Sequence, residues 1–144
     1  MNTSGIRLEA SREIDIRFSE VDSMQIVWHG AYALYFEDAR EAFGAQYGLG
    51  YLDIFSNGYY APLVDLRFSY KKPLIYGAKA RVAIVYRPTE AAKIVFDYRI
   101  TDRQDDHSLI ATGSSVQVFL DKNYQLVWGN PPFYEEWKKK MGLL

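Results

Sequence analysis

In the first third of the chain the hydrophobic residues follow two different spacings, one after the other. Residues 13–18 alternate, with apolar side chains on one side and charged ones on the other. This period of two predicts a half-buried strand. Between residues 30 and 48 the apolar positions recur every three or four residues, and this period predicts one long amphipathic helix.

Between residues 64 and 120 the pattern of apolar and polar residues predicts strands only. Turn residues separate this region from the helix, and no second helix is expected before residue 120. The predicted strands are residues 64–70, 80–87, 94–100 and 109–120, and their connections are short enough for antiparallel hairpins. A short strand at residues 126–128 follows, and Pro131-Pro132 begins a final amphipathic helix that reaches about residue 142.

This order of elements indicates an α+β fold. An antiparallel sheet with one apolar face must cover that face, and residues 30–48 form the one long helix available. We therefore expect a sheet of about five to six strands wrapped around this helix. The core is predicted over about residues 12–122 of a single domain, residues 1–144. Open edge strands favour pairing with a second copy of the chain.

Composition excludes several classes of protein. The 17 Lys and Arg residues against 18 Asp and Glu give a net charge of −1, so the basic surface that nucleic acid or an anionic membrane attracts is not expected. The absence of cysteine excludes disulfides and thiolate catalysis. No metal site is predicted, because the two histidines are far apart and no carboxylates cluster. Without an apolar signal or membrane segment, a cytoplasmic protein is expected. Lys138-Lys139-Lys140 is predicted to lie on a solvated helix face.

Candidate chemistry lies at the junction between the first strand and the long helix. A helix N-terminus presents unpaired N–H groups that can polarise a carbonyl oxygen. Asp22 precedes His29 and Gly30, which begin the predicted helix, by seven residues. Asp22 is therefore a candidate nucleophile or general base at that pole. Considered alone, Asp22 fits a turn residue better, and a single histidine is more often structural than catalytic.

Residues 21–44, VDSMQIVWHGAYALYFEDAREAFG, resemble the N-terminal signature of the hotdog-fold acyl-CoA thioesterases of the 4-hydroxybenzoyl-CoA thioesterase type. Residues 68–77, FSYKKPLIYG, are similar to that family's central strand and the turn after it. The resemblance covers about residues 12–122 and agrees with the predicted order of elements. It implies a hotdog fold, hydrolysis of an acyl-CoA thioester, a homodimer or homotetramer with shared sites, and no metal or redox cofactor.

The resemblance also implies roles for individual residues. Asp22 would attack the thioester carbonyl or activate a water, and the His29 amide would bind the carbonyl oxygen while its imidazole orients the thioester or assists the leaving thiolate. The remaining residues assigned to substrate binding are Gln25, Trp28, Gly30, Tyr32, Glu37, Lys71 and Lys72. For Glu37, a side chain that simply faces solvent is the alternative. The two lysines would meet the phosphates of coenzyme A, although a solvated hairpin end explains them equally well.

Two positions depart from the family pattern. Gln25 stands where the family usually has glycine, and Ala31 stands where asparagine is common. A non-catalytic module that binds an acyl or aromatic ligand is therefore the alternative function. Hydration or dehydration of an acyl thioester on the same fold is a third possibility, which the spacing of Asp22 and His29 disfavours.

Overall fold

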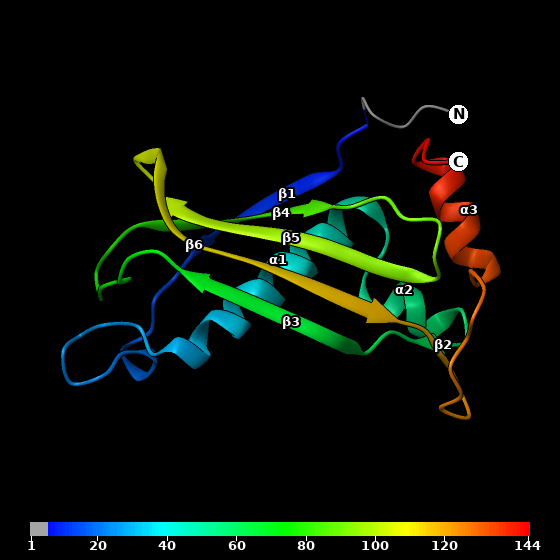
Figure 1. The fold of residues 1–144 in the computed structure, drawn as a ribbon, viewed down its shortest axis with the longest axis horizontal. Helices are drawn as coiled ribbons and strands as arrows, with labels where there is room; N and C mark the ends of the chain where they lie inside the picture. Colours follow the sequence, from blue (N-terminus) through cyan, green and yellow to red (C-terminus); the bar gives the residue numbers. More distant parts are fainter. Residues whose placement is uncertain (1–5) are drawn as a thin grey trace.

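The fold is an antiparallel sheet with one long helix across one of its faces (Figure 1). The structure is a computed structural model that describes residues 6–144, apart from the side chain of Asp106. The five strands lie in the order β1-β4-β5-β6-β3. Their bounds are β1 Glu9–Ile14, β3 Leu63–Tyr70, β4 Ala80–Tyr86, β5 Lys93–Asp102 and β6 Asp105–Val118. The other elements are helices α1 Tyr32–Tyr47, α2 Tyr51–Ser56 and α3 Pro132–Lys140, and the strand pair β2 Tyr59–Tyr60 and β7 Leu120–Asp121.

Helix α1 confirms the predicted long helix, and it begins with a short 3-10 turn at His29–Ala31. Aromatic rings on its buried face pack against the sheet. The ring of Phe36 stacks on Tyr98 with centroids 4.2 Å apart and on Phe68 with centroids 5.1 Å apart. Gly113 on β6 makes this approach possible, because a Cβ there would lie 2.2 Å from the Phe36 ring.

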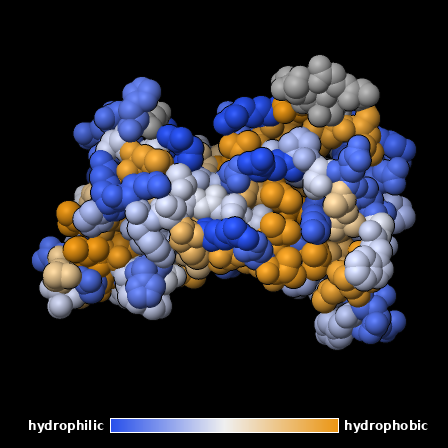
Figure 2. Space-filling view, in the orientation of Figure 1, coloured by the Kyte–Doolittle hydropathy of each residue, from blue (hydrophilic) through white to orange (hydrophobic). Residues whose placement is uncertain are grey.

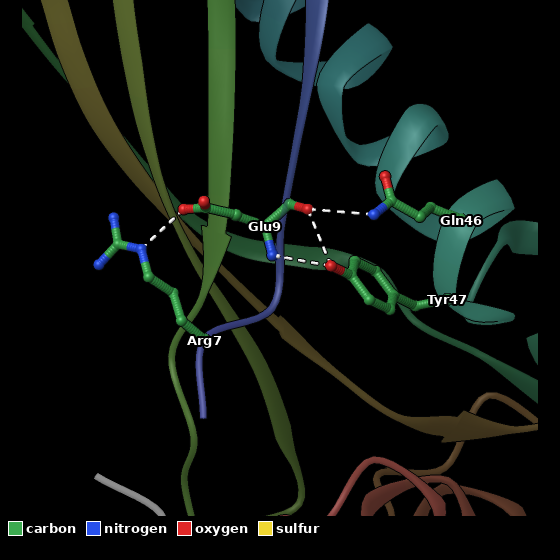
Figure 3. Close-up of polar contacts among 4 residues, drawn as sticks. All are labelled: Arg7, Glu9, Gln46 and Tyr47. Carbon is green, nitrogen blue, oxygen red and sulfur yellow. Dashed lines mark hydrogen bonds and ion pairs between the residues drawn. The ribbon is translucent and has the colours of Figure 1, made fainter. Parts of the chain in front are cut away.

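The last turn of α1 is fastened to β1 (Figure 3). The Tyr47 hydroxyl donates to the Glu9 carbonyl oxygen over 2.9 Å and accepts the Glu9 N–H over 3.1 Å. Gln46 donates to the same carbonyl oxygen over 3.4 Å. Since β1 is an edge strand, these bonds to its backbone fix one edge of the sheet to the helix.

Helix α3 confirms the helix predicted after the proline pair. It lies at one end of the molecule (Figure 1), but its lysines are not all solvated. Lys138 is 1% exposed. Its ammonium group donates to the carbonyl oxygen of Thr89 over 2.7 Å and to Asn130 Oδ1 over 3.2 Å. The prediction of a solvated lysine run is therefore wrong for Lys138, because the loop between β4 and β5 supplies oxygen atoms that the sequence spacing does not show.

Two local predictions near the start of the chain and after α1 are also wrong. The first strand is Glu9–Ile14 instead of residues 13–18, since Ile14 pairs with Ala80, the first residue of β4, and no strand continues beyond it. Phe18 is consequently 74% exposed. Between α1 and β2 the chain forms the helix α2. The sequence pattern did not predict this helix because turn residues flank it. The Asp53 carboxylate accepts the Gly50 N–H over 2.8 Å and so caps its first turn.

Strand pairing differs from the predicted hairpins at β3. β3 pairs with β6 instead of with β4, the next strand in the chain, and therefore forms the edge opposite β1. The connection at residues 71–79 crosses the sheet instead of closing a hairpin. Residues 126–128 form no strand, and Leu126 makes only an isolated bridge to Leu120. The hairpins β4–β5 and β5–β6 agree with the prediction.

Candidate active site

The segment before α1 forms a tight loop closed on itself. Val21 and Val27 form a bridge, and the Asp22 N–H donates to the Ile26 carbonyl oxygen over 2.9 Å. At its tip Gln25 has a φ of 63°, in the left-handed region that only glycine adopts without cost. This is the position at which the resembled family usually has glycine, and the loop geometry explains that preference.

This loop lies against residues 74–76. The Val27 N–H donates to the Leu74 carbonyl oxygen over 2.7 Å, and the Tyr76 N–H donates to the Gln25 carbonyl oxygen over 2.9 Å. Leu74 is 1% exposed. Because Leu74 is fixed in the core, the loop has a rigid support although most of its side chains face outward.

Asp22 is exposed, and its two carboxylate oxygens have different surroundings. Oδ1 accepts the N–H groups of Met24 over 2.8 Å and Ile26 over 3.2 Å. Among the contacts of the described residues, Oδ2 has no hydrogen bond. The side chain thus holds the loop through one oxygen, as a turn residue does.

The helix begins directly after this loop. Trp28 has extended backbone, and its carbonyl oxygen accepts the Ala31 N–H over 2.9 Å. Within the described chain, the N–H groups of His29 and Gly30 have no such partner, as expected of a helix start. The Trp28 ring lies over Gly30, where a Cβ would be 2.2 Å from it, so a larger residue at this position would displace the ring. No hydrogen bond or ion pair of the described residues joins Asp22 to the His29 side chain.

One end of β3 meets the helix start. The Tyr70 hydroxyl donates to the His29 carbonyl oxygen over 3.1 Å. Lys71 and Lys72 follow Tyr70, and both of their N–H groups donate to the Ile110 carbonyl oxygen. The Lys72 ammonium group hydrogen-bonds the Ser108 hydroxyl. Both predicted phosphate-binding lysines therefore lie at the same end of the sheet as the helix start.

Sequence reasoning missed two residues that support this end. Tyr70 lies 41 residues from His29 in the chain, and nothing in its strand pattern marks it. Glu20 accepts the Tyr35 hydroxyl over 2.9 Å, and its carbonyl oxygen accepts the Trp28 N–H over 2.7 Å. Burial of the ring and the bond to Glu20 raise the pKa of Tyr35, so its hydroxyl stays protonated and donates.

Two of the predicted substrate-binding residues lie apart from the helix start or beneath it. Tyr32 is 3% exposed, with its ring 4.9 Å from that of Tyr70. Burial raises its pKa. Glu37 is exposed in the second turn of α1 and lines a separate cavity of about 480 Å³ between α1, α2, β2 and β3. The structure thus gathers Asp22, Gln25, Trp28, His29, Gly30, Lys71 and Lys72 at one end of the sheet and places Glu37 farther along the helix.

Two other kinds of site are absent from the described part of the chain. No group of three or more His, Cys, Asp or Glu side chains is placed to hold a metal ion among residues 6–144, the side chain of Asp106 aside. Within the same residues, none of the helices is both long enough and apolar enough to cross a membrane.

An antiparallel sheet wrapped around one long helix is the hotdog fold, as predicted, and it matches the fold of solved thioesterases. Residues 16–139 match the thioesterase-like superfamily, and the chain belongs to that family. A Bacillus subtilis (strain 168) protein with the provisional name acyl-CoA thioesterase YneP is 36% identical over 109 residues, which span 76% of this chain and 79% of the relative. The predicted enzyme class, a thioester hydrolase, is confirmed.

Solved structures show the same fold. A DHNA-CoA thioesterase from Staphylococcus aureus has a TM-score of 0.78 and 27% identity, covering 94% of this chain and 92% of that chain. A thioesterase from Thermus thermophilus complexed with coenzyme A and Zn has a TM-score of 0.71, with 91% of this chain and 92% of that chain covered. Its 16% identity limits the likeness to the fold.

Proposed function

We propose that the chain hydrolyses acyl-CoA thioesters and that the Asp22 carboxylate is the nucleophile or general base. The observation that carries this proposal is the different hydrogen bonding of the two Asp22 carboxylate oxygens. Oδ1 is held by two loop N–H groups, and Oδ2 has no hydrogen bond among the described residues. The same loop leads into a helix start where the N–H groups of His29 and Gly30 have no partner within the described chain. Membership of the thioesterase-like superfamily and the relative named acyl-CoA thioesterase support the same reaction.

In this mechanism the N–H groups of His29 and Gly30 bind the thioester carbonyl oxygen and stabilise the negative charge that develops on it. Asp22 attacks the carbonyl carbon, the C–S bond breaks, and coenzyme A leaves as a thiolate that takes up a proton. Water then hydrolyses the mixed anhydride and restores the carboxylate. In the alternative route Asp22 removes a proton from the water that attacks directly. Both routes give a carboxylic acid and coenzyme A.

Binding of coenzyme A is assigned to the lysines at the end of β3. The side chains of Lys71 and Lys72 are cations in a chain of net charge −1, and they follow the residue whose hydroxyl reaches His29. Phosphate oxygens accept strong charge-assisted hydrogen bonds from such groups. The exposed rings of Trp28 and Tyr76 lie at the same end, where Figure 2 shows hydrophobic surface around the loop.

We assign the homodimer to the β3 edge, with a homotetramer as a further assembly of such dimers. Among the described residues, β3 pairs with β6 on one side only, and it exposes Leu63, Val64 and Tyr70. An exposed apolar edge strand favours pairing with another strand. Antiparallel pairing of two β3 strands about a twofold axis at their midpoint would bring the start of one strand beside the end of the other. Such pairing gives each helix start a neighbour from the second copy.

The test is release of thiol from a panel of short, long and aromatic acyl-CoA esters. Asp22→Asn keeps an oxygen for Met24 and Ile26 but loses the charge, so the loop is retained. Asp22→Ala also loses the loop bonds. We expect both variants to lose about 100-fold or more in kcat and still to bind acyl-CoA. Asp38→Asn, an exposed carboxylate on α1 outside the site, is the control.

The result also separates the enzyme from the alternative, a non-catalytic acyl or aromatic ligand-binding module. Hydrolysis that survives unchanged in Asp22→Asn would overturn the role of Asp22. No release from any ester, with ligand binding retained, would favour the binding module. Gln25→Gly would then be the first change to test for recovery of hydrolysis.

A further inference from the structure

A cavity of about 480 Å³ lies midway along α1, away from the loop of Asp22. Its volume is within the range of about 300–1,000 Å³ common for small-molecule sites. Most of its wall is apolar, and these residues are Leu49, Ile54, Tyr59, Leu63, Ile94 and Phe96. In Figure 2 hydrophobic surface also gathers where β2 and the first residues of β3 lie. Such a wall suits a flat or branched hydrocarbon body.

One cation faces this apolar wall. Arg40 is half-buried, and its Nη1 donates to the Tyr98 hydroxyl over 3.0 Å. The Tyr98 hydroxyl in turn pairs with Ser115 Oγ over 2.6 Å, and both of these residues are 1% exposed. A guanidinium group has five N–H donors, and no ion pair among the described residues includes Arg40. Its position is thus fixed by one partly buried hydrogen bond, and its other donors are left for a ligand or for water.

Two carboxylates stand beside Arg40. Glu37 and Glu41, one turn before and one residue after Arg40, line the same cavity and are exposed. The polar end of the cavity therefore combines donors with acceptors and has a formal charge of −1. A ligand carboxylate would gain from Arg40 but be repelled by both glutamates. A neutral hydroxyl group both donates and accepts, so it satisfies this combination without repulsion.

We propose that this cavity binds an apolar or aromatic body that carries a neutral hydroxyl group, with Arg40 as the residue that recognises the hydroxyl. Two sources of such a ligand share this chemistry: the acyl group of the thioester and a free small molecule. The first source rests on the proposed thioester hydrolysis, and the second does not.

The experiment is titration calorimetry at pH 7 with three compounds that share one ring system: 2-naphthol, 2-naphthoate and naphthalene. We expect 2-naphthol to bind at least 10-fold more tightly than the other two. In Arg40→Met this preference over naphthalene should disappear. In the double variant Glu37→Gln, Glu41→Gln the repulsion is gone, so 2-naphthoate should gain at least fivefold. Asp38→Asn, on the same helix but outside the cavity, should leave all three affinities unchanged.

Absence of 2-naphthol binding by the unsubstituted protein would overturn the proposal, and so would an unchanged preference in Arg40→Met. Because Arg40→Met also removes the Tyr98 bond, the exposed glutamates provide the second, independent variant. Hydrolysis assays show whether the ligand is the acyl group of the thioester or a free small molecule. If 2-naphthol raises KM for a hydrolysed ester, the cavity holds the acyl group; if it has no effect, the ligand is a separate molecule. Both results uphold the site, and failure of every ester to react bears only on the proposed enzyme function.

Discussion

The hydroxyl of Tyr70, at the end of the edge strand β3, donates a hydrogen bond to the backbone carbonyl oxygen of His29 over 3.1 Å. That carbonyl belongs to the same planar peptide unit as the Gly30 N–H. Holding the oxygen on one side therefore directs the N–H to the opposite side. Tyr70 is thus a positioning residue for a donor that the proposed mechanism uses.

Loss of the Tyr70 hydroxyl should lower kcat. In Tyr70→Phe the ring keeps its contact with Tyr32, while the His29–Gly30 peptide loses its anchor. We expect kcat to fall about 10-fold with KM changed less than twofold, because the donor acts mainly on the developing oxyanion. Steady-state kinetics on a hydrolysed ester provide the measurement. Tyr76→Phe is the matched control, and equal kcat values for the two variants would argue against a positioning role.

Glycine at position 25 should stabilise the loop. Gln25 has a φ of 63°, which costs a non-glycine residue about 1 kcal/mol or more. Part of this gain is offset by the greater freedom of glycine in the unfolded chain. Gln25→Gly should therefore raise the free energy of unfolding by about 0.5–1 kcal/mol in urea titrations. Ser23→Gly, in the same loop without a positive φ, should lower it.

Removal of the buried ammonium group should destabilise the protein. Lys138 donates to Thr89 and Asn130 from a position that is 1% exposed. In Lys138→Met these oxygens lose their donor, which costs about 1–3 kcal/mol. Lys139→Met, whose side chain is 56% exposed, should stay within about 0.5 kcal/mol of the parent. Equal unfolding midpoints for the two variants would contradict the role of Lys138.

Stability should fall in alkaline solution. Tyr86 and Tyr134 share a hydrogen bond of 2.5 Å in the core, and burial raises the pKa of Tyr86 to about 12 and that of Tyr134 further. A raised folded-state pKa means that the folded protein binds more protons than the unfolded chain above pH 10. The stabilisation is complete below pH 10 and is lost as the pH rises toward 12.

The Tyr86 contribution amounts to at most about 2–3 kcal/mol. Unfolding titrations between pH 8 and pH 12 measure it. We expect a shallower loss of stability over this interval in Tyr86→Phe, which has no hydroxyl to ionise there. An identical slope in the variant would show that other groups cause the alkaline loss.

The period of hydrophobic residues predicted the long helix and most strands because one face of each element must be buried. Residues 30–48 show the three-to-four spacing, and α1 occupies Tyr32–Tyr47 within them. The same reasoning missed α2, since a single capped turn between glycines has no period to detect. It also placed the first strand about four residues late, because the alternation of residues 13–18 continues past the last residue that finds a partner in β4.

In the candidate site, too, the sequence predicted some residues and missed others. Asp22 and His29 are near each other in the chain, so a motif could connect them, and the family's glycine at position 25 corresponds to a backbone angle that the loop requires. Tyr70 and Arg40 carried no such signal. Tyr70 reaches His29 only because β3 pairs with β6 at the far edge of the sheet. In the sequence, Arg40 is one of several charged residues on its helix. Only the hydrogen bond to Tyr98 in the folded protein distinguishes it from the others.

The sequence by itself determined the long helix α1, the last helix α3, the strands β3 to β6, and the family to which these residues belong. Each of these depends on contacts between residues near one another in the chain or on the burial of one face. Only the tertiary structure decided the place of β3, the depth of Lys138 and the cavity at Arg40. These features depend on partners tens of residues away, selected by the packing of rings such as Phe36 between Phe68 and Tyr98.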